Sequence, residues 1–265
     1  MTYLGSDVAE ADMRRRTLLT GLGASLLAPA RTAWAGSCEV PTPPMVTGPF
    51  PPLAFRDTAA GKPNPGAWRE VAETDLDLAR VTGAATAAMG QVVRLQVIVL
   101  DAGCRPVPGA QVELWQADTK GFYNHRNEVR VTADELDPGF GYWGSGRTDD
   151  AGRLTVRTIV PGAYPASSSW FRPPHIHWSV QGEGHAPLTT QSYFDGEGLD
   201  GVQAIRAHND ADRILNYRDG FEEGLRGKAL EDARRVARAE LVARFAVPEA
   251  GEPTGQVVLR LGKGA

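Results

Sequence analysis

Short runs in which apolar and polar residues alternate, rich in valine, isoleucine and leucine, recur along the chain between turns that contain glycine or proline. Alternation with a period of two is the pattern of a strand that buries one face. These runs predict strands at residues 92–100, 110–116, 153–159, 175–181, 188–194 and 256–261. Short strands at such intervals are typical of a β-sandwich, so the pattern predicts a mainly β fold.

The pattern becomes helical between residues 201 and 245, where apolar residues stand among charged neighbours. The apolar positions are Leu225, Leu230, Val236 and Leu241. We expect one or two surface helices packed on the sandwich, in preference to a partner-binding helix. Ahead of the strands, residues 41–65 are rich in proline, which favours irregular structure that wraps the core.

Residues 1–35 have the features of an export signal. Residues 14–19 read Arg-Arg-Arg-Thr-Leu-Leu, an apolar stretch follows, and Ala-Trp-Ala at 33–35 is a small-x-small cleavage site. The arginine pair resembles a twin-arginine signal, with an ordinary secretory signal and an uncleaved anchor as alternatives. We expect cleavage after Ala35, a mature domain at residues 36–265, and a periplasmic or extracellular location without membrane attachment.

The composition excludes some classes of function. The chain has 265 residues, 42% apolar and 23% charged, as in an ordinary globular protein with one sizeable core. The formal net charge of −4 gives no basic surface for nucleic acid, which we do not expect as a partner. Cys38 and Cys104 are able to pair in an oxidising compartment, but the sequence does not set their separation. We expect neither cysteine to bind a metal.

Two histidines in the predicted strand 175–181 are candidate metal ligands. Side chains two apart on a strand project to the same face, so His175 and His177 form a pincer, while Ile176 turns into the core. Neutral imidazole suits zinc, copper, iron and nickel alike, and a solvent-facing polar pair is the alternative. The pair alone therefore does not identify a metal.

Two tyrosines accompany this pair. Tyr164 follows a Pro-Gly turn at residues 161–162, which ends the strand before it, and precedes Pro165. We therefore expect Tyr164 in a rigid loop. Tyr123 comes shortly after the predicted strand 110–116.

An ordered series of motifs resembles the intradiol ring-cleaving catechol dioxygenases, and most closely their protocatechuate-cleaving branch. The series comprises residues 47–50, 108–118, 121–123, 157–165, 172–178 and 190–194. The catechol-cleaving branch has an extra helical dimerisation segment ahead of its sandwich, whereas this chain has only a short proline-rich approach. The resemblance implies a β-sandwich of the intradiol type at residues 36–265.

The resemblance also implies the metal and its ligands. In that family ferric iron is held by two tyrosinates and two histidines, and these roles fall on Tyr123, Tyr164, His175 and His177. The residue types agree, since Fe(III) is a hard Lewis acid and phenolate is an anionic hard donor. The charge of the metal must lower the phenol pKa from about 10 for this binding to occur near neutrality.

The implied reaction is cleavage of a protocatechuate-like catechol by O2 to a cis,cis-muconate-type product. Tyr164 is then the ligand that leaves when substrate binds and accepts one of its protons. Arg172 matches the arginine that stabilises the negative charge developing on the ring and oxygen. Gln191 matches a polar residue near the histidines.

Two features depart from the protocatechuate-cleaving pattern. Ala166 stands where those enzymes usually have tryptophan, so we expect a different pocket. Those enzymes also build each site from two chains, and the sequence leaves a homo-oligomer and a hetero-oligomer open.

Two rival classes remain. A non-catalytic transthyretin-like binding module fits the segment 108–114, but has no need of the Tyr and His set. A cupin-like site that adds Glu183 and His185 is disfavoured, because these residues follow the histidine pair too closely.

Overall fold

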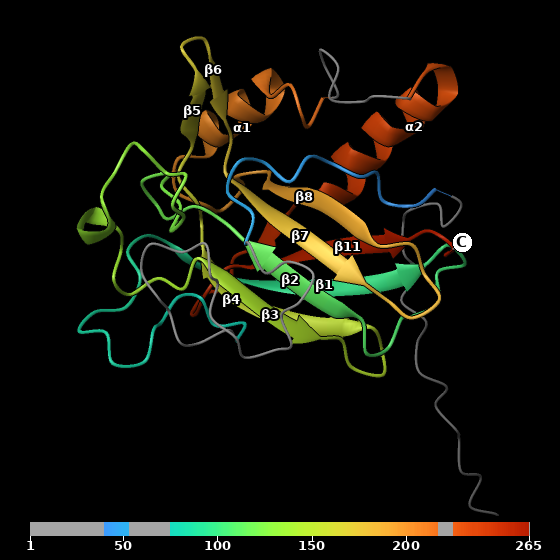
Figure 1. Ribbon diagram of the computed structural model, residues 1–265, viewed down its shortest axis with the longest axis horizontal. Helices are drawn as coiled ribbons and strands as arrows, with labels where there is room; N and C mark the ends of the chain where they lie inside the picture. Colours follow the sequence, from blue (N-terminus) through green and yellow to red (C-terminus); the bar gives the residue numbers. More distant parts are fainter. Residues whose placement is uncertain (1–39, 53–74, 217–224, 265) are drawn as a thin grey trace, which may run out of the picture. The chain divides into compact units, whose positions relative to one another are not determined.

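In the computed structural model, the described residues 40–52, 75–216 and 225–264 form a mainly β structure (Figure 1). The strands are β1 Val92–Asp101, β2 Gln111–Trp115, β3 Trp143–Arg147, β4 Arg153–Ile159, β5 Tyr164–Ser167, β6 Trp170–Arg172, β7 His175–Gln181, β8 Leu188–Phe194, β9 Val242–Ala243, β10 Phe245–Ala246 and β11 Thr254–Leu261. One sheet has the order β10-β11-β1-β4, another has the order β3-β2-β7-β8-β9, and β5 and β6 form a separate hairpin.

The two larger sheets face each other and enclose one hydrophobic core (Figure 1). In the first sheet β1 pairs in parallel with β11 and antiparallel with β4. Core side chains of this sheet include Val93, Leu95, Val97, Val257 and Leu259. The facing side chains of the second sheet include Val112, Leu114, Ile176, Trp178 and Val180. Ile176 therefore lies in the core, as the alternation in its strand predicts.

All six strands predicted from the pattern are present, and β4, β7 and β8 have the predicted bounds. The sequence gives no sign of β3, because glycines occupy two of its alternate positions. A Cβ at Gly144 would lie 2.9 Å from Leu78 Cδ1, and one at Gly146 would lie 2.7 Å from Leu76 Cδ1. Leucines from the segment ahead of β1 thus fill the space that side chains of β3 would take.

The helices are α1 (Val202–Ala211), α2 (Gly227–Val236) and a π-helical turn (Ala237–Leu241), with a short 3-10 turn at Ala133–Glu135. Apolar residues of the second and third elements belong to the core, and these are Ala233, Ala237 and Leu241. Leu225 and Leu230 are half-buried against it. These helical elements thus pack on the sandwich through their apolar side.

Residues 40–52 are irregular and are attached to both sheets. The Met45 amide donates to the Thr189 carbonyl at 2.9 Å, and the Thr42 amide donates to the Arg260 carbonyl at 3.0 Å. The rest of the proline-rich lead and the predicted export signal at residues 1–35 lie outside the described residues. In the described part of the chain, no helix is long and apolar enough to span a bilayer.

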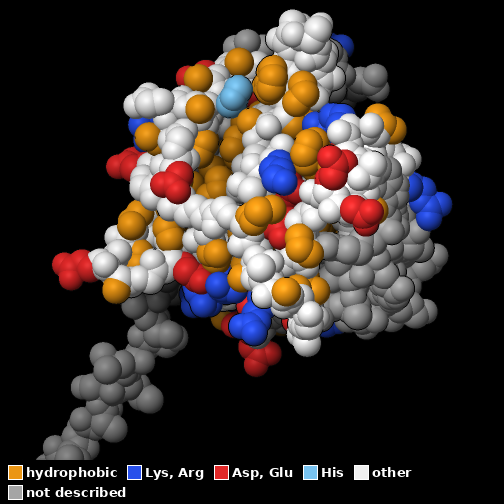
Figure 2. Space-filling view, turned by 90° about the vertical axis from the view of Figure 1, so that its left-hand side faces the viewer, with side chains coloured by type: hydrophobic (Ala, Val, Ile, Leu, Met, Phe, Trp, Pro, Cys, Tyr) orange, Lys and Arg blue, Asp and Glu red, His pale blue; other side chains and the backbone are white. Residues whose placement is uncertain are grey.

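Cys104 lies in the turn after β1 and is disulfide-bonded, whereas Cys38 lies outside the described residues. On the face shown in Figure 2, acidic and basic side chains are interspersed, and neither sign covers a broad area.

Candidate metal centre

The two histidines of β7 are buried beneath neighbouring strands. His177 lies opposite Trp115 of β2, and their rings stack with centroids 4.9 Å apart and an interplanar angle of 6°. His175 lies opposite Tyr193 of β8. Both imidazoles are only 2% exposed, so the pair is buried rather than solvent-facing. Strand pairing on both sides of β7 therefore fixes where the imidazoles point.

Tyr164 begins a strand, and the prediction that it lies in a rigid loop is wrong. β5 and β6 form an antiparallel hairpin in which Tyr164 lies directly opposite Arg172. The sequence obscures this hairpin because Pro165 follows Tyr164, and proline is tolerated in strands only at edges and ends. The hairpin brings Tyr164 and Arg172 to one place on the molecule.

Tyr123 is held by the loop after β2. The buried Asp118 carboxylate accepts the amide of Phe122 at 3.1 Å, and the Glu128 carboxylate accepts the amide of Tyr123 at 3.3 Å. The ring of Phe50 stacks on Tyr123, with centroids 4.6 Å apart. The two carboxylates thus fix the backbone at Tyr123, and Phe50 packs against its buried ring.

The four predicted ligands converge on one point. From His175 Nε2, the distances are 3.2 Å to His177 Nε2, 3.4 Å to Tyr123 Oη and 3.5 Å to Tyr164 Oη. These separations are longer than the usual hydrogen-bond length of about 2.8 to 3.0 Å. The structure thus brings together all four residues, which are spread over residues 123–177 of the sequence, without joining them by short hydrogen bonds.

The donor atoms fit a metal ion between them. The Pro173 carbonyl lies 2.7 Å from His175 Nδ1, so this nitrogen carries the proton and Nε2 presents its lone pair to the other donors. Bonds of about 2 Å from a metal to nitrogen or oxygen place adjacent ligands roughly 3 Å apart. Within the described part of the chain, His177 Nδ1 is buried without a hydrogen-bond partner, and its ring is oriented by Trp115 instead.

Burial keeps these groups neutral in the absence of a cation. It raises the pKa of Tyr123 well above its ordinary value, with Tyr164 adding to the effect, and it also raises the pKa of Tyr164. Burial lowers the pKa of His175 and His177 well below the usual range, and the Arg172 charge acts in the same direction. Phenols in this environment ionise only if a strong positive charge lies beside them.

The donor set distinguishes this centre from the rival cupin-like site. Among the described residues, no group of three or more His, Cys, Asp or Glu side chains is placed to hold a metal. Glu183 and His185 therefore do not join the histidine pair. Two imidazoles and two phenols remain, and phenolate oxygen favours a hard, highly charged cation.

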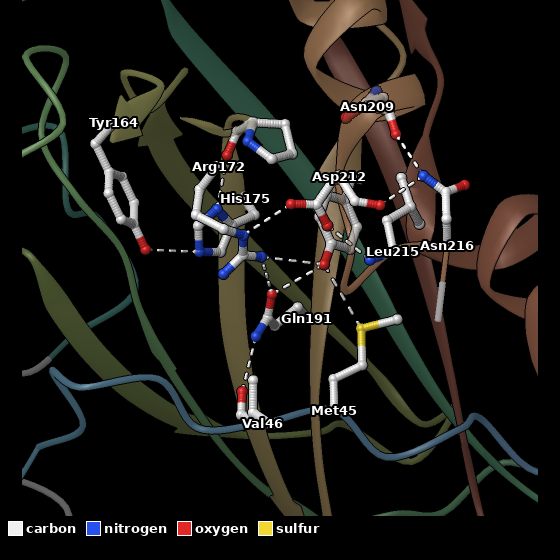
Figure 3. A network of polar contacts seen from close by, with 12 residues as sticks. Met45, Val46, Tyr164, Arg172, His175, Gln191, Asn209, Asp212, Leu215 and Asn216 are labelled. Carbon is white, nitrogen blue, oxygen red and sulfur yellow. Dashed lines mark hydrogen bonds and ion pairs between the residues drawn. The ribbon is translucent and has the colours of Figure 1, made fainter. Parts of the chain in front are cut away.

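Arg172 lies near Tyr164 and His175 in a buried polar network (Figure 3). Its Nε donates to Asp212 at 2.9 Å, and its Nη2 donates to Gln191 Oε1 at 2.6 Å and to Tyr193 Oη at 3.3 Å. The Gln191 amide in turn donates to the Val46 carbonyl at 2.7 Å. Asp212, Gln191 and Tyr193 thus hold the guanidinium in one orientation, and the N-terminal segment in turn holds Gln191.

Gln191 lies opposite His177 across the β7–β8 pair, close to where the resemblance puts it. Its side-chain amide contacts Arg172 rather than an imidazole. Asp212, which the sequence does not single out, lies immediately after α1 and is fully buried. Several aspartates lie near the end of this helix, and nothing in their spacing distinguishes Asp212 from the others. Only its contact with Arg172 in the folded chain shows that it belongs to the site.

A pocket of about 390 Å³ opens beside Tyr164 and Arg172. Most of its lining is apolar, and these residues include Val46, Phe50, Val129, Pro165, Ala166, Trp170 and Ile214. Arg130 also lines it and places its guanidinium carbon 5.0 Å from the centre of the Tyr164 ring. A small aromatic molecule in this pocket would lie next to Tyr164, at one side of the four donor residues.

Comparison with known proteins gives consistent matches. A family model described as Dioxygenase matches residues 64–231. The protocatechuate 3,4-dioxygenase beta chain of Burkholderia cepacia is 37% identical over 165 residues, which cover 60% of this chain and 66% of that protein. The catechol 1,2-dioxygenase of Acinetobacter baylyi is 35% identical over 121 residues, which cover 41% of this chain and 37% of that protein.

Among solved structures, the hydroxyquinol 1,2-dioxygenase of Pseudomonas putida superposes with a TM-score of 0.51 at 18% identity, covering 84% of this chain and 67% of that chain. This likeness shows the shared fold. The family match spans more than half of the chain, and it contains Tyr123, Tyr164, Arg172, His175 and His177. The chain therefore belongs to the intradiol dioxygenase family. It matches at most 66% of the length of the two curated relatives named above.

Proposed function

We propose that this protein is a non-haem Fe(III) enzyme that uses O2 to cleave a catecholic ring between its two hydroxylated carbons, giving a cis,cis-muconate-type product. The observation that carries this proposal is the convergence of Tyr123, Tyr164, His175 and His177 around one point, beside a pocket and a buried arginine. Both oxygen atoms of O2 enter the product.

The two tyrosines and two histidines would hold the iron. Two anionic phenolates favour Fe(III) over Fe(II), and the neutral imidazoles complete the set without adding charge. Ferric iron, when bound, activates a chelated catecholate for reaction with O2. Burial of the four side chains excludes water from the donors, which strengthens their interaction with a cation.

Tyr164 is suited to proton transfer. It begins a short hairpin, whereas Tyr123 is held by Glu128 and by the stacked ring of Phe50. We therefore assign to Tyr164 the role of the ligand that leaves when a catechol binds, and its Oη then accepts one catechol proton. Tyr123 stays in place through the reaction.

Arg172 would stabilise negative charge that develops on the ring and on the attacked oxygen. A positive group fixed before the reaction needs no reorganisation as that charge appears. Asp212, Gln191 and Tyr193 supply the fixed orientation through the bonds already described. Gln191 and Asp212 thus act as positioning residues that work through Arg172.

The first test is the metal and its colour. The purified, iron-supplemented protein should contain about one ferric ion per chain and should be red-brown from tyrosinate-to-iron charge transfer. Addition of a catechol without oxygen should shift this colour, because the substrate replaces Tyr164. A well-folded preparation that holds zinc or no metal, or that stays colourless with iron, refutes the proposal.

The substrate and the assembly are part of the proposal. Relatives are named for protocatechuate and for catechol, so a catechol with or without a ring carboxylate is the starting substrate class. The beta-chain relative also supports an oligomer with a second chain. Mass measurement of the purified chain in solution, alone and from its native source, distinguishes a homo-oligomer from a hetero-oligomer.

Export rests on the sequence of residues 1–35. We propose a twin-arginine route with cleavage after Ala35, which would deliver the domain already folded to the periplasm or the exterior. Cell fractionation and N-terminal sequencing of the mature protein test this. Replacement of Arg15 and Arg16, the pair that precedes Thr17-Leu18-Leu19, by lysine should leave the protein in the cytoplasm, whereas continued export would contradict the route.

A further inference from the structure

The pocket beside the donor cluster is more apolar than its two arginines suggest. Val129 and Ala166 on its wall are exposed, and Ile214 is buried. The side chain of Ala166 is a single methyl group, so the pocket has free room next to Tyr164 where a ring substituent can lie.

The two arginines that line the pocket each form an ion pair with a buried carboxylate. Among the described residues that line it, the cations are Arg130 and Arg172. Arg130 forms an ion pair with Glu128, and Arg172 forms one with Asp212 at 2.9 Å. The side chains of both carboxylates are 0% exposed, so each is committed to its arginine.

The pairing of Arg130 is especially complete. Its Nε donates to Glu128 Oε1 at 2.8 Å, its Nη2 also bonds to Glu128, and the same Nη2 donates to the Gly121 carbonyl at 2.8 Å. Arg213, whose guanidinium carbon lies 5.5 Å from the centre of the Trp170 ring, is not among the lining residues.

Resting on the proposed function, we propose that this pocket selects catechols whose ring substituent is uncharged and apolar, over catechols that carry a carboxylate. This differs from the protocatechuate-like substrate that the sequence resemblance suggests. An anion placed in an apolar pocket loses hydration, and a cation already paired with a buried carboxylate compensates little of that loss. A methyl, ester or larger apolar group instead gains from burial against Val129 and Ile214.

The experiment measures equilibrium binding without oxygen, so that no turnover occurs. The iron-loaded protein is titrated calorimetrically with catechol, 3,4-dihydroxybenzoate and methyl 3,4-dihydroxybenzoate. The acid and its ester are similar in shape, and they differ in the charge of the substituent. We expect the ester to bind at least about tenfold more tightly than the acid, which corresponds to about 1.4 kcal/mol.

The outcomes separate the two proposals. If the iron-loaded protein binds none of the three compounds, the proposed function fails. If it binds catechol but binds the acid as tightly as the ester, the function stands and the substrate inference is overturned.

A pair of variants tests the charge explanation directly. Val129→Lys adds a cation at a lining position whose side chain is 87% exposed, where a lysine is easily accommodated. The ratio of acid to ester affinity should rise several-fold in this variant. Val247→Lys, at a position 55% exposed and outside the pocket lining, is the matched control and should leave the ratio unchanged. An unchanged ratio in Val129→Lys would contradict the inference.

Discussion

The guanidinium of Arg172 and the carboxylate of Asp212 form a buried ion pair that joins the β5–β6 hairpin to the end of α1. Nε and Oδ2 are 2.9 Å apart, and the side chains are 4% and 0% exposed. The second oxygen of Asp212 accepts the Leu215 amide at 2.6 Å, so the carboxylate is itself fixed. A charge held this firmly beside the donor cluster is suited to act on the reaction rather than on the metal.

Arg172→Ala should therefore keep iron and colour but lose most turnover. Removal of one such preorganised group typically costs on the order of 10²-fold or more in rate. The measurements are iron content, visible spectrum and kcat with a good catechol, with Arg206→Ala on α1 as an exposed control. If Arg172→Ala turned over substrate at the parent rate, its role would be structural only.

Asp212→Asn should lower kcat while leaving the anaerobic Kd for catechol nearly unchanged, because it acts through the orientation of Arg172. It should also destabilise the fold by about 3 kcal/mol, since it leaves a buried cation without its partner. The control is Asp210→Asn in the last turn of α1, whose pair with Arg238 is exposed. A variant that loses stability yet retains the parent kcat would show that Asp212 has no positioning role.

The two tyrosines should differ in their spectra. Tyr164→Phe should retain iron and some colour, and should still form a coloured catechol complex while turning over slowly. Tyr123→Phe removes the tyrosinate that stays, so its catechol complex should lose the remaining tyrosinate band. Visible spectra of both variants at matched iron content, with and without anaerobic catechol, are the test. Indistinguishable substrate-bound spectra would refute the assignment of roles.

Gly48→Ala should weaken the centre through His177. Gly48 has φ +71°, and a Cβ there would lie 3.1 Å from His177 Cε1. Gly109→Ala is the matched control, because its φ is +66° but no atom lies within 4 Å of the added Cβ. Both variants bear the cost of about 1 kcal/mol for a left-handed alanine, but only Gly48→Ala should also lose iron affinity. Equal iron content in the two variants would show that an added methyl group next to His177 does not affect iron binding.

The pattern along the chain determined the sandwich and most of its strands. Alternation in β4, β7 and β8 is strong because one face of each strand must be apolar to enter the core, and their bounds follow directly. The same alternation placed His175 and His177 on one face and Ile176 on the other. The ordered motifs were sufficient to indicate the family, which the match over residues 64–231 confirms.

Only the tertiary structure decided how the site is assembled and what surrounds it. The β5–β6 hairpin, which pairs Tyr164 with Arg172, is hidden by Pro165, and β3 is hidden by glycines that give no side-chain pattern. Asp212, Glu128 and Phe50 reach the site from separate segments, and no local spacing predicts such contacts. Burial can be predicted from the sequence because side chains of a strand alternate between the core and the opposite face. Pairing of charges across segments depends on the packing of the domain, so the ion pairs Arg130–Glu128 and Arg172–Asp212 become visible only in the folded chain.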